Sequence, residues 1–322
     1  MIDTPVCPSF SASDVGELLR QVDVLSAMRR AFRALGEGQA VQPPQTLTML
    51  PGGGGDFITY LGALVEEQVF GAKLSPYVVR PEGALVTAWT LLMSMQSGRP
   101  LLLCESKALT TERTAATTAL ATDLLAPGAA KRLAVIGAGP IARSHVRYVA
   151  GLRPWSDIHV YSPSLAGSPD RAKAITELDV RVRAVSDLQE AVEDADVILL
   201  CTSSGTPVLD PRRLSKPALI TSISTNAPRA HEIPPALLNE MDVYCDFRET
   251  TPRTAGEMQI AAAEHGWVQT CVVGDLPELV TNRAPQPDYR RPVFFRSVGL
   301  GIEDIAIANA LRIAHQTSGT RT

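Results

Sequence analysis

The stretch KRLAVIGAGPIA, residues 131–142, decides the fold that this sequence is expected to adopt. The apolar run before the first glycine predicts a buried strand, and Gly137, Gly139 and Ala142 then follow the G-x-G-x-x-A pattern. The first glycine permits a tight turn, the second lets the backbone approach a pyrophosphate, and the third position lets the next helix pack closely on the strand. The N-terminus of that helix offers free N–H groups to phosphates. The stretch therefore predicts a Rossmann-type dinucleotide site, whose expected contacts are Gly137, Gly139, Pro140, Ile141 and Ala142.

Downstream of this turn, segments of strand and helix character alternate. Apolar runs of strand length, IHVYS, VRAVS, VILLCTS, ALITSIS and VYCDF, are separated by stretches with helical spacing or turn residues. Such alternation is typical of a doubly wound parallel sheet. We therefore expect an α/β fold with a Rossmann dinucleotide-binding domain over residues 113–301.

The pattern upstream of the turn is different. Residues 11–35 carry apolar side chains at helical spacing and predict one or two amphipathic helices. The runs FITYLGALV, VFGAKLSPYVV, LVTAWTLLMSM and PLLLCES, punctuated by Gly and Pro, then favour an antiparallel sheet. The last helix, about 301–315, has no strand after it, so we expect it to return to the N-terminal half. The prediction is a discontinuous, β-rich domain over residues 1–112 and 302–322.

The end of the second expected strand bears on the choice of dinucleotide. A carboxylate there would bind the ribose hydroxyls of NAD, but the strand is followed by Ser162 and Ser164 around a proline. Without a carboxylate the site does not repel a 2′-phosphate, which small hydroxyls can bind, so the sequence favours NADP(H) slightly over NAD(H). The ends of later strands, where parallel sheets bind ligands, add the candidate cofactor contacts Cys201, Thr202, Ser203 and Ser224, although they can also be ordinary loop starts.

Composition excludes several other classes of protein. The 322 residues carry a formal net charge of −4, without the basic excess of a nucleic-acid binder. There is neither a basic and apolar leader nor a long apolar run, so we expect a cytoplasmic protein without membrane partners. The five cysteines are far apart and form no CxxC pair, so we expect no metal site and no disulfide framework.

Three polar residues suggest chemistry beyond dinucleotide binding. Lys73 interrupts the strand-like run FGAKLSPYV, where it can bind a carboxylate or donate a proton; the alternative is a lysine on an edge strand. Arg113 is the main cation of a helix of small apolar residues and can clamp a carboxylate; the alternative is a local ion pair with Glu112 or Glu105. Asn226 follows a strand of the nucleotide half and can bind substrate or water, or can simply form a turn.

Several motifs in the same order resemble the ornithine cyclodeaminase and mu-crystallin family over nearly the whole chain: FGAKLSPYV, SGRPLLLCESKALTTERTAATTALA, LAVIGAGPIARSHV, SISTNAPRAHEI and FFRSVGLGIEDIAIA. The resemblance implies a homodimer whose β-rich domain supplies the dimer contact and the substrate site. It implies that Lys73 and Arg113 are the catalytic and carboxylate-binding residues, with Gln45 and Thr87 as further substrate contacts. It also implies that residues 297–300, which include Val298 and Gly299, lie along the nicotinamide.

Two departures from the family pattern favour reduction over cyclodeamination. The cyclodeaminases carry an arginine where this sequence has Gln45, and an aspartate where it has Asn226. An amide cannot take up a proton as a carboxylate can, so an aspartate-dependent cyclodeaminase mechanism is put in doubt.

These observations lead to one hypothesis and three alternatives. The hypothesis is an NAD(P)H-dependent reductase that converts a small imino acid or a cyclic ketimine, such as pyrroline-2-carboxylate, to the L-amino acid, with Lys73, Arg113 and Asn226 as catalytic residues. The alternatives are an ornithine or lysine cyclodeaminase, a carboxyethyl-amino-acid dehydrogenase, and a nucleotide-dependent binding protein without useful chemistry.

Overall fold

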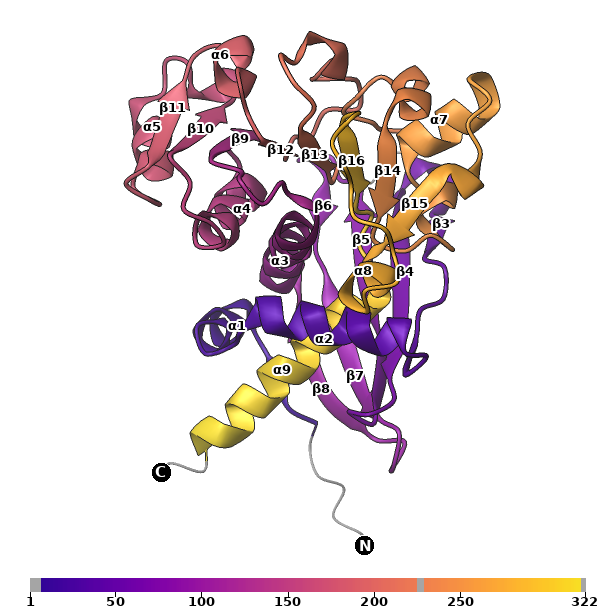
Figure 1. Cartoon of the computed structure of the whole chain (residues 1–322). Helices are drawn as coiled ribbons and strands as arrows, with labels where there is room; N and C mark the ends of the chain where they lie inside the picture. Colours follow the sequence, from indigo (N-terminus) through magenta and orange to yellow (C-terminus); the bar gives the residue numbers. More distant parts are fainter. Residues whose placement is uncertain (1–6, 225–228, 320–322) are drawn as a thin grey trace, which may run out of the picture. The chain divides into compact units, whose positions relative to one another are not determined.

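The computed structural model describes residues 7–224 and 229–319, which form two compact units. The first unit comprises Met1–Arg113 together with Gly299–Thr322, and the second comprises Thr114–Val298. Each unit is built on its own eight-stranded sheet (Figure 1). The predicted fold class, a Rossmann-type parallel sheet plus a discontinuous β-rich unit, is confirmed.

The sheet of the first unit is mainly antiparallel. Its strands follow the order β1-β8-β7-β5-β4-β2, with β3 paired to β4 and β6 paired to β5. β5 lies between β4 and β7 and is hydrogen-bonded to both, so it is an interior strand of the sheet. The strands are β1 (Ser9–Phe10), β2 (Ala40–Val41), β3 (Thr46–Met49), β4 (Gly55–Leu64), β5 (Val69–Val78), β6 (Leu85–Val86), β7 (Trp89–Ser94) and β8 (Pro100–Glu105).

The helices α1 (Ala12–Leu19), α2 (Val24–Gly36) and α9 (Gly301–Gly319) also belong to this unit. The sequence predicts one or two N-terminal helices, and the structure has two; α9 returns to pack on β4, β5 and α2 (Figure 1). Glycines allow this close approach, because a Cβ at Gly62 would lie 2.7 Å from the Ile302 nitrogen and one at Gly301 would lie 2.0 Å from the Leu61 oxygen. The first turn of α9 is therefore held directly on the sheet.

The sheet of the second unit is entirely parallel, in the order β11-β10-β9-β12-β13-β16-β14-β15. The chain starts at β9, moves outward to β11 and then crosses to β12, so the order reverses between β9 and β12, where sheets of this kind bind ligands. The strands are β9 (Arg132–Ile136), β10 (Asp157–Tyr161), β11 (Val182–Val185), β12 (Val197–Leu200), β13 (Leu219–Ser222), β14 (Asp242–Cys245), β15 (Val272–Asp275) and β16 (Val293–Arg296).

The helices that accompany this sheet begin with α3 (Lys107–Leu125), which carries the chain from the first unit into the second. The others are α4 (Pro140–Ala150), α5 (Pro169–Thr176), α6 (Leu188–Val192), α7 (Gly256–Glu264) and α8 (Leu276–Val280). Branched and small apolar residues of the central strands, such as Ala134, Ile198 and Ile220, form the core beneath them. Their near-continuous burial is typical of parallel strands covered on both faces.

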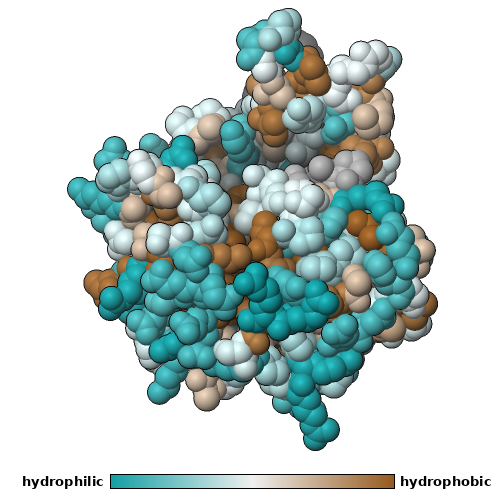
Figure 2. Space-filling view, turned by 90° about the horizontal axis from the view of Figure 1, so that it is seen from above, coloured by the Kyte–Doolittle hydropathy of each residue, from teal (hydrophilic) through white to brown (hydrophobic). Residues whose placement is uncertain are grey.

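The surface of the chain is mixed in polarity. In the face drawn in Figure 2, hydrophilic residues predominate and apolar residues occur in patches between them. Within residues 7–224 and 229–319, no helix combines the length and the apolar character that crossing a bilayer requires.

Candidate functional site

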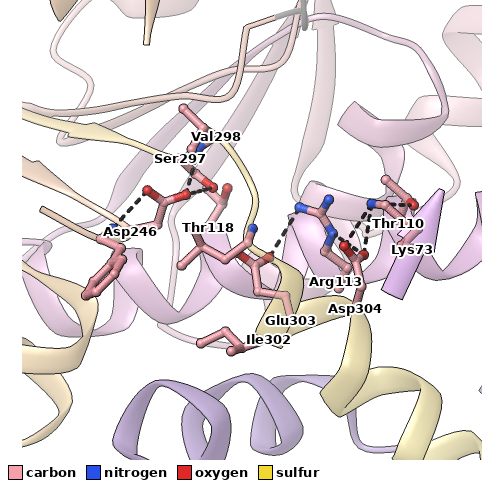
Figure 3. Close-up of polar contacts among 12 residues, drawn as sticks. Lys73, Thr110, Arg113, Thr118, Asp246, Ser297, Val298, Ile302, Glu303 and Asp304 are labelled. Carbon is pink, nitrogen blue, oxygen red and sulfur yellow. Dashed lines mark hydrogen bonds and ion pairs between the residues drawn. The ribbon is translucent and has the colours of Figure 1, made fainter. Parts of the chain in front are cut away.

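Lys73 is buried at the centre of the first unit. Its side chain is 1% exposed and projects from β5 on the face that α9 covers (Figure 3). Its Nζ lies 3.0 Å from Oδ1 and 2.9 Å from Oδ2 of Asp304, 3.5 Å from the hydroxyl of Thr110, and 4.1 Å from the centre of the Tyr60 ring. The alternative of an edge-strand lysine is wrong, because β5 is an interior strand.

Arg113 shares the same carboxylate. Its Nε lies 3.1 Å from Oδ1 of Asp304, and its Nη1 lies 3.2 Å from Oε2 of Glu303, so its ion pairs are made with α9 rather than with the local Glu112 or Glu105 (Figure 3). Glu303 also accepts a hydrogen bond from the backbone N–H of Leu300 at 3.0 Å. These contacts fix the guanidinium at the N-terminus of α9.

Gly299, predicted as a cofactor contact, also lies against Arg113. Its φ is +81°, and a Cβ there would lie 2.2 Å from Nη1 of Arg113. Glycine is therefore required by backbone conformation and by the space that the Arg113 guanidinium occupies. A contact between Gly299 and the cofactor stays a prediction.

The two cations differ in their proton chemistry. Burial lowers the pKa of Lys73 to about 8; Asp304 opposes this shift and the positive charge of Arg113 adds to it. Burial works against the charge of Arg113 as well, but Asp304 and Glu303 raise its pKa above the ordinary value. Arg113 is thus a permanent cation suited to a carboxylate, whereas Lys73 can exchange a proton near neutral pH.

Sequence reasoning missed the two carboxylates that organise this cluster. Glu303 and Asp304 are both buried, in the otherwise apolar helix segment GIEDIAIA. Two adjacent acids in an apolar helix were a usable signal, since buried carboxylates require partners.

Gln45 and Thr87 do not join this cluster. Both are half-buried in the first unit, and neither forms a hydrogen bond with Lys73 or Arg113 in the part of the chain that the structure describes. Thr87 donates its backbone N–H to Pro76 at 3.3 Å, and Oε1 of Gln45 is buried without a described partner. Their roles as substrate contacts stay predictions.

The glycine turn of the second unit has the geometry that a dinucleotide requires. Gly137 has a φ of +127°, and a Cβ there would lie 2.4 Å from the carbonyl oxygen of Cys201 at the end of β12. Gly139 caps α4, and nothing lies within 4 Å of where its Cβ would be, which leaves room for a ligand at the helix N-terminus. Pro140 and Ile141 begin the helix, and Ala142 is buried. The residues present therefore fit a pyrophosphate.

The end of β10 carries hydroxyls where an NAD-specific site carries an acid. β10 pairs with β9 up to the Tyr161–Ile136 position, so the following Ser162 lies beside the glycine turn. The hydroxyls of Ser162 and Ser164 are 2.9 Å apart, and Ser164 is exposed.

The ends of β12 and β13 are joined through a residue that the sequence did not single out. Thr202 donates its N–H and its hydroxyl to Glu232, at 2.9 and 2.7 Å, and Ser224 donates its N–H to the same carboxylate at 2.9 Å. Cys201 is buried and Ser203 is exposed. Asn226, predicted as catalytic, lies outside the described residues.

A second acid, Asp246, holds the end of β16 (Figure 3). It accepts hydrogen bonds from the backbone N–H of Val298 at 2.7 Å and from the hydroxyl of Ser297 at 3.1 Å. Buried Arg296 meets Glu257 at 2.6 Å and donates to backbone oxygens at the end of β13. The ends of β12, β13, β16 and β14 are therefore tied to one another by the buried side chains of Glu232, Arg296 and Asp246.

Comparison with known proteins assigns the family. The sequence model of the ornithine cyclodeaminase/mu-crystallin family matches residues 9–318, and the chain belongs to this family. It is 59% identical over 299 residues to an NAD(P)H-dependent anabolic L-arginine dehydrogenase of Pseudomonas aeruginosa, a match that covers 93% of this chain and 94% of that protein. It is 26% identical over 313 residues to the ketimine reductase mu-crystallin of Mus musculus, covering 94% and 95%.

Among solved structures, the chain resembles that of a Thermococcus litoralis Δ¹-pyrroline-2-carboxylate reductase in complex with NADH and L-proline. The TM-score is 0.87 at 25% identity, and the match covers 97% of this chain and 98% of that one. The predicted family and the predicted enzyme class, an oxidoreductase, are confirmed by these relatives.

Proposed function

We propose that this chain is an NAD(P)H-dependent amino-acid dehydrogenase that reduces the imino acid formed from a 2-oxo acid and ammonia, with L-arginine as its amino-acid product. The observation that carries the reaction type is the buried cluster of Lys73, Asp304 and Arg113. The choice of a basic substrate is supported by the 59% identity to an L-arginine dehydrogenase, which extends over nearly the whole of both chains.

The mechanism assigns one role to each of three residues of the buried cluster, Arg113, Lys73 and Asp304, and one to Asn226. Arg113 binds the substrate carboxylate, because its charge persists at every working pH. Lys73, whose pKa is near 8, supplies a proton to the substrate nitrogen and so keeps the imine cationic and electrophilic. Asp304 holds both cations at the spacing that this requires. Asn226 orients the substrate nitrogen or a water.

The second unit supplies the residues that would hold the cofactor. The turn at Gly137 and Gly139 would hold the pyrophosphate, and the strand ends at Thr202, Ser224 and Val298 would hold the nicotinamide half. A dinucleotide held there would supply the hydride that the imine carbon accepts. We infer that both dinucleotides are accepted with NADP(H) favoured, because Ser162 and Ser164 replace the carboxylate that would repel a 2′-phosphate.

A cyclic ketimine is the second candidate substrate. The structural similarity to a pyrroline-2-carboxylate reductase supports it, as does the 26% identity to a ketimine reductase. Both candidates undergo the same chemistry, hydride addition to a C=N carbon beside a carboxylate. They differ in the side chain, which is open in the arginine precursor and is closed onto the imine nitrogen in the cyclic ketimine.

The proposal is tested by substrate comparison with the full chain. Oxidation of NADPH or NADH is followed with 5-guanidino-2-oxopentanoate plus ammonia and, separately, with pyrroline-2-carboxylate. We expect turnover with both and a higher kcat/KM with the guanidino substrate and NADPH. L-Ornithine with NAD⁺ is the cyclodeaminase control, and ammonia release there without net change in nicotinamide absorbance would replace the proposed reaction with deamination. Binding of NADPH without turnover of either imine would favour a binding protein.

We further infer that the chain forms a homodimer through the uncovered face of the first sheet. In register across four strands, Leu61 lies opposite Ala72, Ala72 opposite Leu91, and Leu91 opposite Leu103, and the three leucines are exposed. Exposed Leu74 and Trp89 extend this row. A continuous apolar face on a sheet marks an interface. In a two-fold symmetric dimer the same face of a second copy of the chain would pack against it. Light scattering should give twice the chain mass, and Leu91→Arg should give the mass of one chain; a monomeric unmodified protein would exclude the dimer.

A further inference from the structure

Glu232 is a fully buried carboxylate that joins two neighbouring strand ends of the second unit. Its Oε1 accepts hydrogen bonds from the N–H and the hydroxyl of Thr202, at 2.9 and 2.7 Å. Its Oε2 accepts from the hydroxyl of Ser222 at 2.7 Å and from the N–H of Ser224 at 2.9 Å. Thr202 follows β12 and Ser222 ends β13, so one side chain sets the position of both strand ends.

The charge of Glu232 is balanced by these four donors rather than by a cation. The guanidinium of Arg296, which bonds to the carbonyl oxygen of Ser222, forms its ion pair with Glu257, and Glu232 forms no ion pair with any other described residue. A buried carboxylate is tolerated when donors point at it, and each charge-assisted hydrogen bond fixes the donor in turn. The Thr202 turn and the end of β13 are therefore held rigidly.

Ser224, just after the end of β13, is held in a strained backbone conformation by Glu232. Its φ is +50°, in the left-handed region that serine rarely adopts, and its N–H bond to Glu232 offsets part of that strain. Its Oγ is buried and has no hydrogen-bond partner among the described residues. Buried hydroxyls usually have a hydrogen-bond partner. This one lies at the edge where parallel sheets bind ligands, so a bound ligand can supply the partner.

We propose that Glu232 is the positioning residue of the nicotinamide site: it orients the Thr202 turn and the Ser224 hydroxyl, which meet the cofactor, without touching the cofactor itself. The inference rests on the proposed function, which supplies the nature of the ligand. Both donors of Thr202 are occupied by Glu232, whereas the neighbouring Ser203 is exposed. The Ser203 hydroxyl, together with Oγ of Ser224, suits the carboxamide and ribose hydroxyls of a nicotinamide nucleoside.

The test compares Glu232→Gln with Asp275→Asn in the full chain. Asp275 is a matched control, since it is a second buried carboxylate of the same unit and accepts from the N–H groups of Arg248 and Glu278 beside the edge strand β15. NADPH binding is measured by nicotinamide fluorescence, and folding by melting temperature. Glu232→Gln should raise the Kd for NADPH at least about tenfold, because the new amide nitrogen opposes an N–H donor. Asp275→Asn should lower the melting temperature and leave the Kd unchanged.

Ser222→Ala keeps the proposal testable if Glu232→Gln does not fold. Ser222 is buried with its hydroxyl on Glu232, so this substitution reaches the cofactor only through that carboxylate, and we expect a Kd raised about threefold. An unchanged Kd in folded Glu232→Gln, or in Ser222→Ala when Glu232→Gln does not fold, would overturn the proposal. Equal increases in Kd for Glu232→Gln and Asp275→Asn would also do so, because general destabilisation would then explain the loss. Failure of the unmodified chain to bind either dinucleotide would instead contradict the proposed function.

Discussion

Replacing Lys73 with methionine should lower kcat about a thousandfold while the Kd for NADPH stays within about twofold, since general acid catalysis contributes about 10²–10⁴ in rate. Methionine retains the length of the side chain between Tyr60 and Asp304 but carries neither charge nor proton. The dinucleotide turn belongs to the other unit and does not include this side chain, so we expect cofactor binding to be retained. Steady-state kinetics with the preferred imine and NADPH fluorescence measure the two quantities.

The pH dependence of the unmodified chain separates the acid role from a purely electrostatic one. With a pKa near 8, Lys73 is protonated below that pH and loses its proton above it, so kcat for imine reduction should fall as the pH rises through about 8. Lys73→Arg serves as the matched control, because it keeps the positive charge but cannot release a proton. A Lys73→Arg chain with more than a tenth of the unmodified kcat would show that charge alone suffices at this position.

Replacing Asp304 with asparagine should have the second-largest effect, on both stability and the pH profile. The carboxylate lies between Lys73 and Arg113, and breaking a buried ion pair in this way costs about 3–5 kcal/mol. Asp304 also raises the pKa of Lys73, so its removal should move that pKa below 8 and shift the decline in kcat to lower pH. Melting temperature and the pH dependence of kcat provide the two readouts.

Glu303→Gln is the matched control for this prediction. Glu303 pairs with Arg113 and accepts from the N–H of Leu300, but Lys73 bonds to Asp304. The alkaline decline in kcat should therefore shift less in Glu303→Gln than in Asp304→Asn. Equal shifts in the two variants, or no shift in Asp304→Asn, would show that Asp304 does not set the proton affinity of Lys73.

Much of the fold was predictable because its signals are local. The glycines of the dinucleotide turn, the alternation of strands and helices after it, and the two amphipathic N-terminal helices all depend on residues near one another in the chain. Lys73 and Arg113 were also predictable as candidates, since a cation in an apolar strand or helix is conspicuous wherever the element packs. The strands β15 and β16 were not predicted as strands, because the burial of each depends on its position in the sheet rather than on a pattern in its own residues.

The sequence by itself determined that a dinucleotide turn, a lysine and an arginine belong to this protein, but only the tertiary structure decided what those cations meet. Asp304 is 231 positions from Lys73 and 191 from Arg113, and it reaches them because α9 packs on the strand that carries the lysine. Glu232 and Asp246 were equally invisible in the sequence, where an acid beside a turn is usually solvated. Local patterns encode conformation and burial, whereas the pairing of buried charges depends on which distant segments the topology brings into contact.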